Sequence, residues 1–184
     1  MMPVILCGKE GDMTPETIFR IQLVLGYVAW LLFFGAYVRP KLRSMSGMDA
    51  QRAIATLHSF RFFGLVFILP GVVGTLPSSF TRFAAYGDFV TGLLAIAALM
   101  AFRTRPLFTA LVVAFNIAGV VDLLVDYYHA IVQGVPFIAG QMASAYWIPI
   151  LYVPVLMMTH IISFYLLLRP QRAAAPVLAG QATA

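Results

Sequence analysis

Long apolar segments separated by short polar turns are the feature that most restricts the fold of this chain. Five such segments occur, and each reaches about the 20 residues that an α-helix needs to cross a bilayer. Hydrophobic residues make up 61% of the 184 residues and charged residues 10%, whereas about a quarter of a typical soluble domain is charged. The segments leave no stretch long enough for a separate soluble domain. The sequence therefore predicts an all-α, polytopic membrane bundle of five transmembrane helices.

The five predicted transmembrane helices cover residues 16–38, 51–73, 82–102, 106–131 and 145–168. We expect the first to begin after Thr14, because threonine is a favoured N-cap residue and Pro15 suits the first helical position. Residues 1–15 then form an N-terminal tail. Residues 169–184 are rich in Ala, Pro and Gln, a composition that predicts a disordered C-terminal tail.

The distribution of Lys and Arg predicts the orientation of the bundle, because positive residues are enriched in cytoplasmic loops. One side of the predicted membrane carries eight of them: Arg39, Lys41, Arg43, Arg52, Arg103, Arg105, Arg169 and Arg172. The opposite side carries three: Lys9, Arg20 and Arg82. With five spans, the loops rich in Lys and Arg all fall on one side of the membrane. We therefore expect the N-terminus outside and the C-terminal tail in the cytoplasm.

Composition and motifs exclude several classes of function. The formal charge of +5 comes mainly from predicted loops, without a basic face, so we expect no nucleic acid as a partner. Cys7 is the only cysteine, which rules out an intrachain disulfide and a cysteine-based metal cluster. The chain contains no Ser-His-Asp series, phosphate-binding loop or His-Glu-x-x-His motif. No motif therefore names a reaction.

Four polar side chains are predicted to share an inner layer of the bundle. A rise of about 1.5 Å per residue places Arg61, Asn116 and His160 at similar depths, and His58 shares a helix face with Arg61. Burying an ionisable group in hydrocarbon costs about 2.5–3.5 kcal/mol, so we expect such groups to have polar partners. The alternative is that His58 and Arg61 reach toward the cytoplasmic interface, and that His160 bonds with a neighbouring carbonyl group.

Three carboxylates and an imidazole are predicted to form an outer layer. Asp122, Asp126 and His129 are spaced i, i+4, i+7 and share one helix face, with Asp88 of the preceding helix at a depth comparable to Asp122. Neighbouring carboxylates can share a proton or hold a cation. Alternatively, Asp126 and His129 lie in interfacial water and Asp88 caps a helix. Asp122 is the strongest candidate. Its expected partner is Arg61, whose side chain must extend outward, or meet a bridging water, over a depth difference of about 10 Å.

Two cofactor-based interpretations have weaker support. His58 and His160 lie on different predicted helices at similar depth, as axial haem ligands would. The Asp-x3-Asp-x2-His series that starts at Asp122 offers metal-ligating groups, but one helix face cannot complete a site, and zinc prefers more His or Cys. Neither pattern is specific, so we expect neither a cofactor nor a metal.

Four short segments carry a resemblance to a known group of proteins. They are Leu57-His58-Ser59-Phe60-Arg61-Phe62-Phe63-Gly64, Leu69-Pro70-Gly71-Val72-Val73, Ala85-Tyr86-Gly87-Asp88 and Ala145-Tyr146-Trp147-Ile148-Pro149. Over about residues 13–170, the chain resembles an uncharacterised group of small bacterial inner-membrane proteins. The resemblance implies a bacterial origin, a place in the inner membrane and a five-span fold. It implies no activity.

Three functions remain open at this point. The first, which we favour, is a non-enzymatic bundle that binds a lipophilic ligand or a partner membrane protein through an outward-opening polar pocket. The second is a proton- or cation-coupled transporter that works as a homo-oligomer, with a relay formed by Asp88, Asp122, Asp126 and His160. The absence of a visible internal repeat counts against it. The third is a membrane-embedded enzyme acting on a lipid, with His58 and His160 as acid–base groups.

Overall fold

The structure, a computed structural model, describes residues 13–168, and every regular element within this range is a helix. Helix α1 (Pro15–Phe33) begins at the predicted residue, because the Thr14 side chain accepts a hydrogen bond from the backbone N–H of Thr17 at 3.2 Å. This bond satisfies one of the N–H groups that the start of a helix leaves without a partner. The predicted N-cap is therefore confirmed.

The first helical segment extends beyond its predicted end. After α1 the chain passes through a π-helical turn, η1 (Phe34–Val38), into α2 (Arg39–Ser44). Pro40 lies just after the π turn. It has no N–H to donate, and in a regular α-helix its ring would crowd the carbonyl group one turn earlier. The π turn accommodates this proline without ending the helix, so the segment continues to Ser44 rather than ending at Val38.

The second pass of the chain is not a uniform α-helix. It begins as α3 (Gly47–His58), which is capped by the side chain of Ser46, and it continues as a 3-10 helix, η2 (Ser59–Ile68). Runs of 3-10 helix longer than three or four residues are uncommon, and they often occur at functional positions. The helix predicted over residues 51–73 thus changes type at Ser59 and ends earlier than expected.

The remaining elements are α4 (Ser78–Met100), α5 (Arg105–Val132), the 3-10 helix η3 (Val135–Ala145), the π-helical turn η4 (Ile148–Tyr152) and α6 (Val153–Leu168). Helices α4 and α5 are the longest regular helices of the described chain. The last predicted helix begins later than expected, at η4, because the preceding residues form η3.

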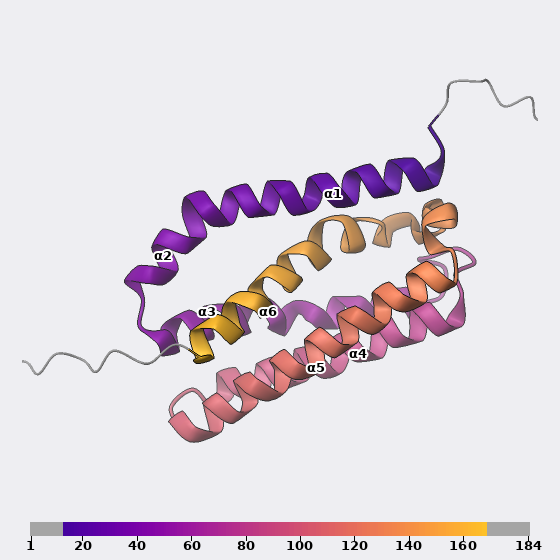
Figure 1. The fold of residues 1–184 in the computed structure, drawn as a ribbon. Helices are drawn as coiled ribbons and strands as arrows, with labels where there is room; N and C mark the ends of the chain where they lie inside the picture. Colours follow the sequence, from indigo (N-terminus) through magenta and orange to yellow (C-terminus); the bar gives the residue numbers. More distant parts are fainter. Residues whose placement is uncertain (1–12, 169–184) are drawn as a thin grey trace, which may run out of the picture.

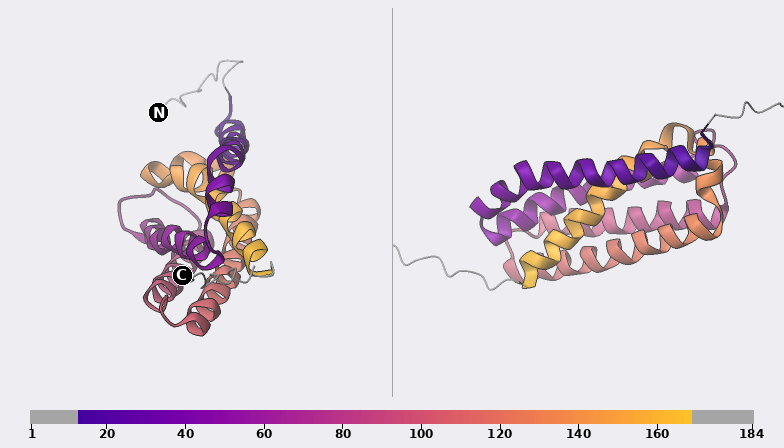
Figure 2. Two further views of the ribbon diagram at one scale, coloured as in Figure 1. Left: turned by 90° about the vertical axis from the view of Figure 1, so that its left-hand side faces the viewer. Right: turned by 45° about the horizontal axis from the view of Figure 1, so that its top comes forward.

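Helices α3–η2, α4, α5 and α6 pack together along a common axis, and α1 lies along one side (Figure 1). Both views of Figure 2 keep α1 at the edge of the bundle, where it contacts η3, η4 and α6. The most extensive packing joins α4 to η2 and to α5. Small residues on the buried face of α4 permit this close approach; they are Ala84, Ala85, Gly92, Ala95 and Ala98.

Two apolar clusters, one toward each end of the bundle, enclose a polar layer. One contains Phe67 and Ala85, and the other contains Ala55 and Ala95. On α3–η2 the polar layer falls between Ala55 and Phe67, and on α4 it falls between Ala85 and Ala95. The candidate site therefore lies in the middle of the bundle, where hydration is least accessible.

Four helices of the described chain are long and apolar enough to cross a membrane, by length and composition: Pro15–Ser44, Ser78–Met100, Arg105–Val132 and Ile148–Leu168. Helices α3 and η2 have 12 and 10 residues, so neither reaches this length alone. Residues 1–12 of the predicted N-terminal tail and the predicted tail 169–184 lie outside the described residues. Three of the basic residues used to predict orientation lie there as well: Lys9, Arg169 and Arg172.

Candidate functional site

Helix η2 places Arg61 in the middle of the bundle. A 3-10 helix has three residues per turn, so residues three apart lie above one another on one face. His58, Arg61, Gly64 and Phe67 follow this spacing, and all four are buried. An α-helix turns by about 100° per residue and would place Phe67 on the side opposite His58. The 3-10 geometry therefore gives η2 one continuous buried face that includes a charged residue.

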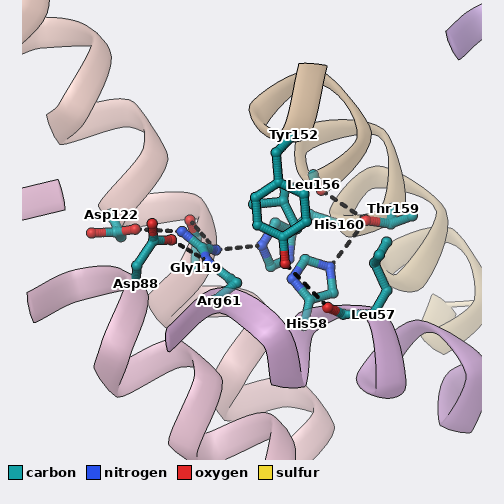
Figure 3. A network of polar contacts seen from close by, with 10 residues as sticks. All are labelled: Leu57, His58, Arg61, Asp88, Gly119, Asp122, Tyr152, Leu156, Thr159 and His160. Atoms are coloured by element: carbon teal, nitrogen blue, oxygen red, sulfur yellow. Dashed lines mark hydrogen bonds and ion pairs between the residues drawn. The ribbon is translucent and has the colours of Figure 1, made fainter. Parts of the chain in front are cut away.

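Arg61 forms ion pairs with two aspartates from neighbouring helices (Figure 3). Its Nε–H donates to Oδ1 of Asp88 on α4 at 2.6 Å, and its Nη2 donates to Oδ2 of Asp122 on α5. The Arg61 side chain is 0% exposed and each aspartate side chain is 7% exposed. A buried charge is tolerated only when it is paired. The guanidinium extends far enough to meet Asp122 directly, and it connects η2, α4 and α5 at one level.

Two glycines make room for these ion pairs. A Cβ atom at Gly64 of η2 would overlap the carboxylate of Asp88, and a Cβ atom at Gly87 of α4 would overlap the carboxylate of Asp122. Small residues of this kind let the backbones of membrane helices approach closely. Each aspartate thus lies against the bare backbone of a neighbouring helix.

His160 on α6 continues the network on the other side of Arg61. Nη1 of Arg61 approaches Nε2 of His160 at 3.2 Å and the Gly119 carbonyl oxygen at 3.4 Å. Because a guanidinium only donates, Nε2 of His160 must accept, and the ring proton lies on Nδ1. Nδ1–H then donates to Oδ1 of Asn116 on α5 at 2.9 Å. The geometry therefore selects the neutral Nδ1–H tautomer of His160.

Ser163 on α6 and Gln51 on α3, which the sequence interpretation missed, extend this network. Nδ2 of Asn116 donates to Oγ of Ser163 at 2.8 Å, and Oγ of Ser163 donates to Oε1 of Gln51 at 2.6 Å. From the arginine to Gln51, every donor therefore points in the same direction. Helical spacing could have indicated both residues, because Ser163 follows His160 by three positions and Gln51 precedes His58 by seven.

His58 lies beside the network without a hydrogen bond to Arg61 in the structure. Its Nε2 donates to Oγ1 of Thr159 at 3.0 Å, since that hydroxyl already donates to the Val155 carbonyl at 2.8 Å. Within the described residues its Nδ1 is buried and has no hydrogen-bond partner. The ring centroids of His58 and His160 are 4.1 Å apart, which leaves no room for a porphyrin between them. The two histidines therefore cannot act as opposite axial ligands of a haem in this arrangement.

A cavity of about 340 Å³ lies next to the ion pairs, between α1, α4, α5 and the η3–η4 region. Most of its wall is apolar and includes Phe19, Phe67 and Met142. The carboxylates on the wall belong to Asp88 and Asp126. Oδ1 of Asp126 is buried and has no hydrogen-bond partner among residues 13–168. This arrangement suits a mainly apolar molecule that carries one polar group.

His129 is not part of the network. Its ring stacks on Phe83 with 4.7 Å between centroids. In the part of the chain that the structure describes, no group of three or more His, Cys, Asp or Glu side chains is placed to hold a metal ion. The predicted outer layer is thus divided among three environments. Asp88 and Asp122 pair with the arginine, Asp126 lines the cavity, and His129 packs on an aromatic ring.

Comparison with known families shows that a family model covers this network. The family described as "Domain of unknown function (DUF8737)" matches residues 18–168. The chain belongs to this family. The DUF8737 region includes the whole polar network from Gln51 to Ser163 and every residue on the cavity wall. No curated protein and no solved structure matches the chain. The DUF8737 description names no activity, so a function must rest on the geometry of the site.

Proposed function

We propose that the protein is a five-pass membrane protein of the bacterial inner membrane that binds a lipophilic molecule carrying a positive charge. Four of the five crossings are the long apolar helices named above, and the remaining one, second in chain order, is formed by α3 and η2 together. At about 1.5 Å per α-helical residue and about 2.0 Å per 3-10 residue, their 12 and 10 residues extend about 38 Å. This exceeds the roughly 30 Å of a hydrocarbon core. As an α-helix throughout, the same 22 residues would extend about 33 Å, so the 3-10 geometry lengthens a segment that is already long enough to cross.

The orientation that we propose has the N-terminus outside and the C-terminus in the cytoplasm. At the end of the bundle where α2 meets α3, six basic residues of the described chain occur: Arg39, Lys41, Arg43, Arg52, Arg103 and Arg105. The other end carries Arg20 and Arg82. Positive residues concentrate on the cytoplasmic side of bacterial membranes. The cavity, which includes Phe19 and Arg20 near the start of α1, then opens toward the outer side.

The charges around the cavity carry the proposal. Asp88, Asp122 and Asp126 lie in or next to the cavity wall, and Arg61 is the one cation that pairs with this group in the described chain. Asp126 has no hydrogen-bond partner at its buried Oδ1. An ionised carboxylate without a partner is unfavourable in a low-dielectric interior, so a positive group bound beside Asp126 would stabilise its charged form. The apolar wall accounts for a lipophilic body and Asp126 for the charged group.

Binding of tetraphenylphosphonium, a lipophilic cation, to the protein in lipid nanodiscs tests the proposal. Triphenylphosphine oxide is the uncharged probe, and empty nanodiscs measure partition into lipid. The Asp126→Asn variant keeps the shape of the side chain and removes its charge. We expect it to weaken binding of the cation at least about tenfold, which corresponds to about 1.4 kcal/mol, and to leave binding of the uncharged probe unchanged.

Asp49→Asn is the matched control, because Asp49 is exposed near the start of α3 and does not line the cavity. It removes the same charge, and we expect wild-type affinity for the cation. Equal affinity of the wild type and Asp126→Asn for tetraphenylphosphonium would overturn the proposal. Equal weakening by Asp126→Asn and Asp49→Asn would also overturn it, because the effect would then reflect only net charge.

A second function, proton-coupled transport of such a cation, is favoured by the directed series of hydrogen bonds. It connects Arg61 and its aspartates through His160 and Asn116 to Gln51 near the opposite end of the bundle. Uptake of tetraphenylphosphonium into liposomes under an imposed pH gradient tests it. We expect uptake that depends on the gradient and is lost in Asp122→Asn. Wild-type uptake that is indifferent to the gradient would contradict transport while leaving the binding proposal intact.

A lipid-modifying enzyme has less support from the geometry. His58 and His160 are both fully buried and do not line the cavity. Both ring nitrogens of His160 are engaged with Arg61 and Asn116. An acid–base group must reach the proton that it transfers, directly or through one water. In this arrangement neither imidazole can reach a molecule bound in the cavity.

A further inference from the structure

A groove of about 460 Å³ lies between the end of the first helical segment and α6, away from the cavity described above. Its wall is mainly apolar and includes Leu31, Phe34, Met158 and Ile161. Gly35 of the π turn η1 also lines it, and a Cβ atom there would meet no other atom within 4 Å. The groove therefore has the surface of an acyl-chain site and is open at its π-helical side.

Two arginines line the end of this groove. Arg39 and Arg43 are four residues apart on α2, so they lie on the same helix face. Both side chains are exposed, and no carboxylate of residues 13–168 forms an ion pair with either. Two unpaired guanidinium groups one turn apart make this end of the groove complementary to an anion.

The length of the first helical segment places these arginines at the level of lipid headgroups. The segment Pro15–Ser44 has 30 residues, which extend about 45 Å as a helix, compared with about 30 Å for the hydrocarbon core. When the apolar residues before Arg39 occupy the hydrocarbon, the last turns emerge from it. The wider π turn at η1 also alters the rotation of the residues that follow it. The apolar part of the groove then faces acyl chains, and Arg39 and Arg43 face phosphates.

We propose that this groove binds an anionic phospholipid, with the phosphate between Arg39 and Arg43 and one acyl chain along the apolar wall. Arginine pairs with phosphate oxygens through two parallel N–H donors, which gives a stronger contact than a single hydrogen bond. Basic pockets between transmembrane helices on the cytoplasmic side are typical sites for anionic headgroups. This site shares no residue with the cavity near Asp126, so it rests on the membrane orientation proposed above but not on the binding of a cation.

Quenching of Trp30 fluorescence by brominated lipids tests the site. The Trp30 ring lies 6.1 Å from the ring of Phe34 on the groove wall, and Trp147→Phe removes the other of the two tryptophans. The protein is reconstituted in phosphatidylcholine that contains brominated phosphatidylglycerol or, separately, brominated phosphatidylcholine. We expect phosphatidylglycerol to bind about fivefold or more tightly than phosphatidylcholine. Equal quenching by both lipids would overturn the proposal.

Three further variants distinguish lipid binding in the groove from a general effect of surface charge. We expect Arg39→Gln/Arg43→Gln to abolish the preference for phosphatidylglycerol, and Gly35→Leu to reduce quenching by filling the groove. Arg103→Gln/Arg105→Gln removes the same charge from the exposed turn between α4 and α5 and should keep the preference. An equal loss in this control pair, or unchanged quenching in Gly35→Leu, would contradict a lipid in the groove. If the wild type is an oligomer that Gly35→Leu dissociates, the groove is an interface between copies of the chain, and the lipid proposal is contradicted.

Discussion

The Nε–H of Arg61 donates to Oδ1 of Asp88 at 2.6 Å, and the two side chains are 0% and 7% exposed. This ion pair joins the 3-10 helix η2 to α4, the helix that packs most extensively against it. The second ion pair of Arg61, with Asp122, adds α5. A buried ion pair loses several kcal/mol when one partner is removed, because the other charge remains uncompensated. The same residues that border the candidate site therefore also hold three helices together.

Replacing Arg61 should destabilise the bundle strongly. We expect Arg61→Gln to lower the free energy of unfolding by about 3–5 kcal/mol, because Asp88 and Asp122 keep their burial and lose their cation. Reversible unfolding in mixed detergent micelles measures this difference. Arg82→Gln, on an exposed face of α4, should change it by no more than about 0.5 kcal/mol. Similar losses in the two variants would show that the buried ion pairs contribute little.

The glycine beside Asp88 should not tolerate even one methyl group. Gly64→Ala places a Cβ atom against the Asp88 carboxylate, so we expect a loss of about 1–3 kcal/mol in unfolding free energy. Gly35→Ala is the control, because its Cβ atom would meet no other atom within 4 Å. Alanine also restricts the unfolded chain more than glycine, so this control should be neutral or slightly stabilising. A harmless Gly64→Ala would contradict the close approach of η2 and α4.

The 3-10 geometry of η2 distinguishes two phenylalanines only five positions apart. Phe67 is 4% exposed and Phe62 is 39% exposed. We expect Phe67→Ala to cost about 3–5 kcal/mol in the same unfolding measurement. Phe62→Ala should cost about 1 kcal/mol or less, because its ring lies mostly outside the core. The opposite order of the two losses would indicate a different helical register after Ser59.

The hydrogen-bond network predicts a different neutral tautomer for each of the two buried histidines. His160 accepts from Arg61 at Nε2, so its proton should lie on Nδ1, whereas His58 donates to Thr159 from Nε2. Nitrogen NMR spectra of protein labelled in its histidine rings distinguish the two tautomers. We expect one neutral ring of each type from these residues. A proton on Nε2 of His160 would contradict the contact with Arg61.

Hydropathy and charge were sufficient to predict the helical bundle, the polar residues inside it and Arg61 as the partner of Asp122, but not that one side chain joins the two predicted layers. The two predicted layers were separated by assigning one depth to each residue. The Arg61 side chain extends across that separation and contacts both Asp122 and His160. The depth argument indicated the contact with Asp122 but treated the two layers as separate, because it gave each residue the depth of its backbone and not of the end of its side chain. Arg61 thus belongs to both predicted layers.

Other features of the site had a weak signal, or none, in a single sequence. The change from α-helix to 3-10 helix at Ser59 alters the hydrogen-bond partner by one residue, and the local residue types do not decide it. Gln51 and Ser163 are buried but uncharged. The cost of burying charge, which singled out the ionisable residues, therefore did not single them out. Gly64 acquires its role only when Asp88 is placed beside it. Each of these features depends on a contact between helices.

The most direct test of the proposed binding function observes the carboxylate of Asp126 itself. Carbon NMR of protein labelled at the aspartate carboxyl groups, with Asp126→Asn to assign the signal, follows this group during titration with tetraphenylphosphonium. We expect the Asp126 signal to shift with a saturable dependence on the cation and to shift much less with triphenylphosphine oxide. An Asp126 signal that does not respond to the cation, or responds equally to the uncharged probe, would contradict a site for the positive charge at this residue.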